Sequence, residues 1–195
     1  MQYSKASIID SKDIASLHKI GIPTGFLSKQ SIYFLSELYS FLIENELVIV
    51  AKNNKKVVGF IAVATNTSNL YKRFLRKNII LLIKFAIQNI FSIEFIKKSL
   101  ETFNAPNSTK VSVTSDKIPE LLSIVVDGNY KNKGIGKKLL KEIERELTLS
   151  SFKKYKVVVG CKLDANIFYK KNNFIKFKEI ELHKGEKSFI YIKNI

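Results

Sequence analysis

Apolar residues recur along the chain with two different periods, and this separates predicted strands from predicted helices. Short apolar runs predict strands, and apolar residues three or four positions apart predict helices with one buried face. Strands are predicted over residues 4–9, 47–52, 56–64, 120–127, 155–161, 174–182 and 187–193. Helices are predicted over residues 11–20, 28–45, 69–90, 92–103, 134–149 and 165–172. This order indicates an α/β fold built on one mixed sheet of about seven strands.

Local signals refine the ends of these elements. Ser11 is a candidate N-cap for the first helix, and Asn53 with Asn54 predicts a hairpin turn. Residues 66–104 are apolar, basic and helical in pattern, so we expect a helical insertion between the third and fourth strands. We expect residues 1–195 to form one domain that carries this insertion.

The composition excludes several classes of protein. Hydrophobic residues make up 46% of the 195 residues and charged residues 26%, a balance typical of a globular chain. Cys161 is the single cysteine and there are two histidines, which argues against a disulfide scaffold and against a cysteine-based or histidine-rich metal site. The N-terminal residues lack the apolar core of a signal peptide and no uncharged run is long enough to span a bilayer, so we expect a cytoplasmic protein.

The net charge of +16 at pH 7 favours an anionic partner. Arg73, Arg76 and Arg145 are the arginines among 33 basic residues, although specific recognition of phosphates or bases tends to use arginine. The charge is therefore either a solvated lysine surface or a field that attracts anionic ligands. Basic and apolar residues interleave over residues 70–98, where the alternatives are a helical cap on the sheet and peripheral contact with an anionic membrane.

The most informative segment runs from a predicted buried strand, through a short loop with two glycines, straight into a helix. The first-turn amides of a helix have no internal partner and its N-terminus carries positive partial charge, which favours a pyrophosphate. Gly134 and Gly136 would let a ligand approach the backbone, and Lys131, Lys133 and Lys137 add positive charge. The alternative is a tight turn with solvated lysines, because the spacing fits neither a Walker A loop nor the dinucleotide-binding motif.

Two segments resemble motifs of the GNAT superfamily of acyl-CoA-dependent N-acyltransferases. Residues 131–136, KNKGIG, resemble its motif A, with Lys131 where arginine or glutamine is usual. Residues 165–174, ANIFYKKNNF, resemble the helix that lines the pantetheine arm, with Asn173 where glycine usually ends that helix. Asparagine also tolerates the left-handed backbone conformation that such a position needs.

The resemblance implies a mostly antiparallel sheet flanked by helices, with acetyl-CoA as co-substrate and no metal. Lys162 stands where the family often has an asparagine that contacts the cofactor, so Asn166 is a candidate for that contact, unless the strand end differs by one residue. The cofactor-binding residues that the resemblance implies are Ile124, Val125, Val126, Lys131, Asn132, Lys133, Gly134, Ile135, Gly136, Lys137, Asn166 and Tyr169.

The implied reaction is direct transfer of an acetyl group to an amine, which needs a base for the amine and a proton donor for the leaving thiolate. Tyr169 is the candidate donor, and Glu120, which opens its strand, is the candidate base. His183 is the alternative base, whereas His18 is expected in the core or on the surface, and Cys161 in the core. Nothing indicates a Ser-His-Asp or Cys-His nucleophile.

The acceptor is expected to be a primary amine of a small molecule, with an amino sugar favoured. The candidate acceptor-binding residues are Thr24, Phe26, Tyr33, Tyr71, Arg73 and Arg76. The stretches IPTGFLS, TNTSNLYKRFL and ELLSIVVD also look like family members found beside glycan-biosynthesis genes. The family often forms dimers, so a homodimer is an open expectation. The alternatives are a protein N-terminus or lysine as acceptor, or a non-enzymatic basic module that binds nucleic acid or membrane. Nucleic acid is disfavoured because no helix-turn-helix or base-stacking signature is present.

Overall fold

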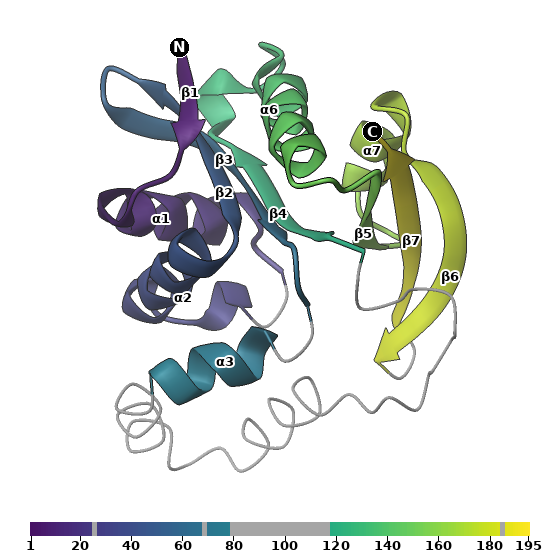
Figure 1. The fold of residues 1–195 in the computed structure, drawn as a ribbon, viewed down its shortest axis with the longest axis horizontal. Coiled ribbons are helices and arrows are strands. Elements are labelled where there is room, and N and C mark those ends of the chain that lie inside the picture. The colour runs from purple at the N-terminus through teal and green to yellow at the C-terminus, as the bar shows by residue number, and fades with distance from the viewer. Residues whose placement is uncertain (25–26, 68–69, 79–117, 184–185) are drawn as a thin grey trace. The chain divides into compact units, whose positions relative to one another are not determined.

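The computed structural model describes residues 1–24, 27–67, 70–78, 118–183 and 186–195. The chain divides into two compact units, residues 1–66 with 117–195 and residues 67–116. The larger unit contains a seven-stranded sheet with the order β1-β2-β3-β4-β5-β7-β6 (Figure 1). The strands are β1 (Gln2–Lys5), β2 (Leu47–Asn53), β3 (Lys56–Ala64), β4 (Glu120–Val126), β5 (Lys154–Gly160), β6 (Ile175–His183) and β7 (Glu186–Asn194). All neighbouring pairs are antiparallel except β4 with β5, so the predicted fold class is confirmed.

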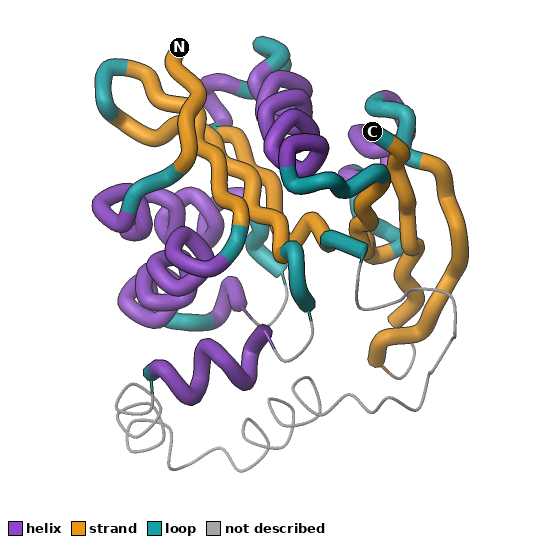
Figure 2. The backbone as a smooth tube through the Cα atoms, in the orientation of Figure 1, coloured by secondary structure: helices purple, strands orange, loops and turns teal. Residues whose placement is uncertain are grey.

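The helices of the larger unit follow the predicted order along the chain. Figure 2 shows them in purple beside the orange strands. They are α1 (Ser11–Gly21), α2 (Ile32–Asn45), α6 (Ile135–Leu149) and α7 (Ala165–Lys171), with short 3-10 helices η1 (Ile8–Asp10), η2 (Leu27–Lys29) and η4 (Gly128–Tyr130). Figure 1 shows α1 and α2 on one side of the strands and α6 on the other. The predicted hairpin between β2 and β3 is confirmed, but its turn residues are Asn54 and Lys55 and not Asn53 and Asn54. Asn53 still pairs with Lys56, and Asn54 and Lys55 both have positive φ, as a type I′ turn requires.

Three predicted boundaries near the N-terminus are wrong. The first strand ends at Lys5, not at residue 9, because the Asp10 carboxylate accepts hydrogen bonds from the backbone N–H and hydroxyl of Ser7 and closes a 3-10 turn there. Ser11 is not the N-cap but lies inside α1, and its hydroxyl is hydrogen-bonded to that of Ser36 on α2 at 3.1 Å. The second helix begins at Ile32 and not at residue 28, because Ser31 caps it by accepting a hydrogen bond from the N–H of Phe34.

The predicted insertion is described in part. Helix α3 (Leu70–Lys77) lies within the first predicted helix of the insertion, and Leu70 and Phe74, one turn apart, are buried. The rest of the helix predicted over 69–90 and the helix predicted over 92–103 lie outside the described residues. Within the described ranges, no helix has the length and apolar character that crossing a bilayer requires. The assignment of one domain stays a prediction.

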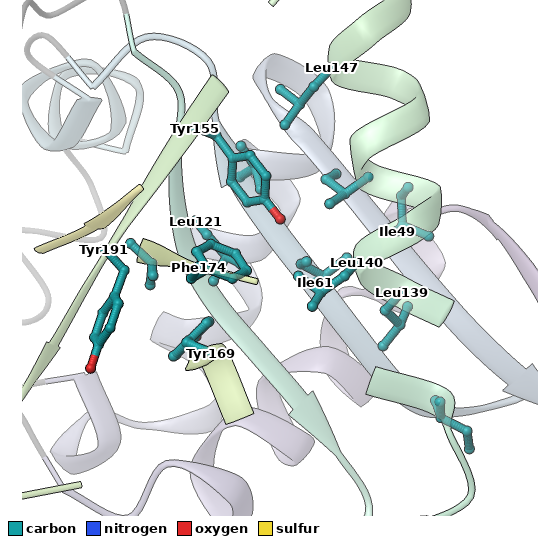
Figure 3. Close-up of a cluster of buried hydrophobic side chains, with 14 of the residues drawn as sticks. Ile49, Ile61, Leu121, Leu139, Leu140, Leu147, Tyr155, Tyr169, Phe174 and Tyr191 are labelled. Carbon is teal, nitrogen blue, oxygen red and sulfur yellow. The ribbon is translucent and has the colours of Figure 1, made fainter. Parts of the chain in front are cut away.

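Helix α6 covers one face of the sheet with an apolar stripe (Figure 3). Leu139, Ile143 and Leu147 are fully buried at the i, i+4 and i+8 spacing of one helical face, and Leu140, three residues before Ile143, is buried beside them. Each such side chain contributes roughly 1.5–3 kcal/mol on burial. They pack in one cluster with residues of β2, β3, β4, β5, α7 and β7, so a single helix joins the two halves of the sheet.

A buried polar chain lies on the opposite face, among α1, α2 and β4. Nδ1 of His18 is 2.6 Å from the Tyr39 hydroxyl, which is 3.0 Å from the Ser123 hydroxyl. These three residues expose 4%, 2% and 5% of their surface. The sequence leaves open whether His18 lies in the core or on the surface, and the structure places it in the core. Burial lowers the pKa of His18 from 6.5 to about 4, because the charged imidazolium would lose its hydration there.

Acid destabilisation through His18 is the first prediction. Between pH 6.5 and about 4 the unfolded chain binds a proton at this histidine and the folded chain does not, so stability falls as the pH is lowered through this window. The expected contribution is about 3 kcal/mol. We expect urea unfolding at pH 7 and pH 4.5 to show a larger loss for the wild type than for His18→Asn, whose carboxamide keeps a partner for Tyr39. Equal losses in the two proteins would contradict this burial of His18.

Candidate functional site

The sheet separates in its middle, between β4 and β5. These strands are seven residues each but pair only through Glu120 with Lys156 and Leu121 with Val157. From Ser123 to Val126, β4 pairs with β3 on one edge and, among the described residues, with no strand on the other. Backbone N–H and C=O groups on that edge are thereby available to an extended ligand. This edge includes residues 124–126, which the sequence predicts to bind the cofactor.

A β-bulge in β4 coincides with the separation. Ser123 faces Ala62 of β3 and Leu121 faces Val63, so Leu122 is an extra residue without an opposite partner. A bulge bends its strand and increases the local twist, which turns β4 away from β5. It also reverses the faces, because Leu121 packs on the α6 side whereas Ser123, the second residue after it, contacts Tyr39 on the α2 side.

The loop after β4 leads directly into the N-terminus of α6. Asp127 accepts a hydrogen bond from the N–H of Asn129 at 2.9 Å, and the Lys133 ammonium donates to the Asn129 carbonyl at 3.1 Å. No side chain caps α6, and its first turn contains no acidic residue. Lys131 and Lys137 are exposed, and no ion pair in the described part of the chain involves them. The first-turn amides and these ammonium groups therefore form a cationic surface suited to a phosphate.

The two glycines of this segment have different roles. Gly134 is the N-cap of α6 with φ of 76°, and a Cβ there would meet nothing within 4 Å, so the backbone is open to a ligand. At Gly136 a Cβ would lie 3.1 Å from Phe168 of α7, which means that this glycine serves the close packing of α6 on α7. The sequence interpretation of ligand approach fits Gly134, and Gly136 adds a packing role that the sequence does not reveal.

Helix α7 starts from a connection that Asn166 holds together. The Asn166 amide nitrogen donates to the carbonyls of Gly160 and Leu163 at 2.9 and 2.6 Å, with a longer contact of 3.3 Å to that of Cys161. Its side-chain oxygen accepts a hydrogen bond from the Tyr191 hydroxyl at 3.0 Å. All polar atoms of this buried side chain are thus engaged within the protein, which leaves the predicted contact between Asn166 and the cofactor without support in this geometry.

The end of α7 confirms the expectation for Asn173. Its φ is 65°, its N–H donates to the Lys170 carbonyl, and the N–H of Phe174 donates to that of Tyr169. These two bonds form a Schellman motif, which usually employs glycine at this position. The rings of Phe174 and Tyr191 then pack against the Tyr169 ring at centroid distances of 5.1 and 6.3 Å.

Tyr169 differs from the other buried tyrosines in its hydroxyl group. The hydroxyls of Tyr39, Tyr155 and Tyr191 are each hydrogen-bonded to another side chain. The Tyr169 hydroxyl has no hydrogen-bond partner among the described residues, although the residue is buried and only 5% of its surface is exposed. Burial raises the pKa of the Tyr169 phenol, which keeps it protonated. A protonated, unpaired hydroxyl on a fixed ring is able to donate a proton or a hydrogen bond to a ligand.

The candidate base is engaged in an ion pair. Oε2 of Glu120 lies 3.2 Å from Nζ of Lys156, at the parallel pairing of β4 with β5. The alternative base, His183, ends β6, and its side chain lies outside the described residues. Sequence reasoning missed the Lys156 partner, because the two residues are 36 positions apart and only the parallel register joins them.

The candidate acceptor-binding residues are described unevenly. Thr24 and Tyr33 are exposed, and the side chains of Phe26 and Tyr71 lie outside the description. Arg73 and Arg76 lie on α3, in the smaller unit, where Arg76 is exposed and Arg73 half-buried. Their joint contact with an acceptor stays a prediction. Within the described residues, no group of three or more His, Cys, Asp and Glu side chains could hold a metal ion.

Comparison with known proteins adds independent information. Residues 104–176, less than half of the chain, match a family model described as an acetyltransferase (GNAT) domain. No curated protein matches the sequence significantly. Among solved structures, the ribosomal-protein-S18-alanine N-acetyltransferase from Escherichia coli has a TM-score of 0.62 at 14% identity, over 100% of this chain and 93% of the other.

Two further structures show the same fold. The PaiA N-acetyltransferase from Thermoplasma acidophilum, solved in complex with coenzyme A, has a TM-score of 0.61 at 16% identity, over 100% of this chain and 98% of the other. Aminoglycoside 6'-acetyltransferase type Ii has a TM-score of 0.62 at 14% identity, over 100% and 97%. The family match thus spans β4, α6, β5 and α7, and the similar structures share the fold. Neither supports the expected link to glycan biosynthesis.

The network of Asn166 generates the second prediction. Asn166→Ala removes the partners of two carbonyls and of the Tyr191 hydroxyl, so we expect a loss of roughly 2–4 kcal/mol in the free energy of unfolding, measured in urea. Asn172→Ala at the C-cap of the same helix, which loses one bond to the Phe168 carbonyl, is the control and should lose less than about 1 kcal/mol. Unchanged stability of Asn166→Ala with weakened binding of coenzyme A would favour the cofactor contact instead.

Proposed function

We propose that the protein transfers an acetyl group from acetyl-CoA to the primary amine of a small molecule, an amino sugar being the favoured acceptor. One observation supports the proposal: the edge of β4 that pairs with no strand among the described residues is followed, after residues 127–134, by the open, cationic N-terminus of α6. An extended arm with amide groups pairs with such an edge, and a pyrophosphate pairs with such a helix end. Acetyl-CoA contains both groups, and its amide-containing arm leads to its pyrophosphate.

Different residues would align the substrate, donate a proton and accept a proton during the transfer. When bound, acetyl-CoA supplies a thioester, whose C–S bond breaks as the bond from the acetyl carbon to the amine nitrogen forms. Residues 124–126 would align the arm and direct a backbone N–H at the carbonyl oxygen. The Tyr169 hydroxyl would donate its proton to the departing sulfur. Glu120 would take the proton of the amine directly or through water, and Lys156 would hold its carboxylate in place.

The proposed acceptor rests on the sequence. Basic residues recur over residues 70–98, and Arg73 and Arg76 can each pair with a phosphate. They support an amino sugar that carries phosphate. The names of the similar structures do not favour either kind of acceptor, because one specifies a ribosomal protein and another an aminoglycoside. A protein N-terminus or lysine is the second candidate, and a panel of amines and peptides with thiol-release detection distinguishes the two. A cytoplasmic location and a homodimer stay predictions.

Isothermal titration with acetyl-CoA, free coenzyme A and ATP at two salt concentrations tests the proposal. We expect saturable binding of both coenzyme forms near one equivalent, which survives added salt, because the arm and not charge alone contributes. Weak binding that ATP matches and salt removes would mean that the charge of +16 attracts anions generally. Nucleic acid and anionic vesicles would then be tested as partners.

Gly134 supplies the third prediction. Gly134→Asp introduces a negative charge into the cationic surface at the N-terminus of α6. The titration should therefore show a loss of coenzyme A affinity of 100-fold or more, roughly 3 kcal/mol. Gly134→Asn is the matched control, since it has the same size and tolerates φ of 76° but adds no charge. The control should retain more affinity, and both variants should keep a folded far-UV spectrum. Unchanged affinity in Gly134→Asp would remove this loop from the site.

Tyr169 supplies the fourth prediction. Tyr169→Phe removes a proton donor, so kcat should fall by roughly 10–100-fold while the KM for acetyl-CoA stays within about twofold. Because this hydroxyl has no partner among the described residues, Tm should hardly change. Tyr155→Phe is the control, which loses the bond to Glu144 and should lower Tm without changing kcat. An unchanged kcat in Tyr169→Phe would exclude Tyr169 as the donor.

A further inference from the structure

The strand that would hold the arm of acetyl-CoA has a sequence that does not fix its own register. β4 reads ELLSIVV, in which five of seven residues are apolar and almost interchangeable in a buried strand. Alternation of polar and apolar residues normally decides which side chains face the core, and it is absent here. A bulge at Leu121 or Ser123 would satisfy the hydrophobic pattern nearly as well as the observed bulge at Leu122. Some other contact must select the observed register.

Ser123 carries the polar side chain in the interior of β4, and it follows the bulge immediately. Its hydroxyl is 3.0 Å from that of Tyr39, 84 residues away in the chain. The Tyr39 hydroxyl is in turn 2.6 Å from Nδ1 of His18. One hydrogen-bond chain thus joins α1 and α2 to the first residue of β4 that has left β5.

The burial of the His18–Tyr39–Ser123 hydrogen-bond chain indicates a role other than stability. A buried polar group costs desolvation free energy, and apolar side chains of similar shape serve a core as well or better. Single buried polar contacts are known to select register in otherwise apolar interfaces. These three side chains are also poorly suited to storing a proton, because burial lowers the pKa of His18 to about 4. In addition, Nε2 of His18 has no hydrogen-bond partner among the described residues.

We infer that the His18–Tyr39–Ser123 hydrogen-bond chain is a positioning device that fixes the β4 bulge at Leu122 and so sets where β4 separates from β5. The inference rests on the proposed function in so far as the separated edge at residues 124–126 receives acetyl-CoA. These three residues do not themselves touch the reacting atoms. They act through the backbone of β4, on which the alignment of the arm depends.

Removal of single hydroxyls tests the inference. Ser123→Ala and Tyr39→Phe should each weaken coenzyme A binding and raise the KM for acetyl-CoA by tenfold or more, with a smaller effect on kcat. Because both variants break the same chain, the double variant should be no worse than either single one. In addition, NMR amide exchange should accelerate by tenfold or more, in the absence of any ligand, at those amides of residues 124–126 that bond to β3, because register heterogeneity breaks this pairing.

Matched variants separate positioning from general stability. Ser36→Ala removes the hydroxyl contact between α2 and Ser11 of α1 but does not reach β4, so it should lower Tm without changing the KM for acetyl-CoA or the β4 exchange. His18→Asn keeps a partner for Tyr39 and should behave as wild type in binding, whereas His18→Leu should behave as Tyr39→Phe. Should Ser123→Ala fail to fold, Tyr39→Phe, which keeps the ring packed on Phe60, decides.

The outcomes for the two proposals are distinguishable. If the wild type binds coenzyme A and the variants bind it equally, with unchanged exchange at residues 124–126, the positioning inference is overturned and the proposed function stands. If the wild type does not bind coenzyme A, the proposed function falls, and the exchange measurement alone decides whether the chain fixes the register of β4.

Discussion

The separation of β4 from β5 after two paired residues is the constraint on which the rest of the structure depends. A sheet that stops pairing in its middle leaves backbone donors and acceptors without strand partners, and such groups need water or a ligand. The same separation would divide the core into two halves if nothing joined them. The remaining features of the larger unit either hold these halves together or make the exposed edge usable.

Helix α6 performs the first task. Its apolar stripe packs on residues of both halves, and Glu144 accepts hydrogen bonds from Tyr155 of β5 at 2.8 Å and from Lys193 of β7 at 2.6 Å. On the other half, Glu146 pairs with Lys5 of β1 at 2.8 Å. Because one rigid helix is anchored at both sides, the strands are able to diverge without separating the core. Its N-terminus is thereby held near the end of the β4 edge that pairs with no described strand, where we propose that the pyrophosphate binds.

Sequence and structure agree best where local chemistry is sufficient. The glycine-containing loop, the helix after it and the left-handed turn at Asn173 all follow from residues within a few positions of one another. They disagree where a side chain has a distant partner. Asn166 satisfies local carbonyls and Tyr191, and Glu120 pairs with Lys156 through the strand register, so a motif that assigns these residues to a ligand misses their partners. His18 illustrates the same limit, because its partner Tyr39 is 21 positions away.

The sequence by itself determined the order of strands and helices, the hairpin at Asn54 and the phosphate-suited loop at Gly134, because periodicity, turn propensity and backbone freedom are properties of short segments. Only the tertiary structure decided where β4 leaves β5, because the apolar pattern of ELLSIVV is compatible with more than one register. It also decided which of the four tyrosines buried among the described residues has no hydrogen-bond partner there, since partners far apart in the chain meet only when the sheet and its helices pack.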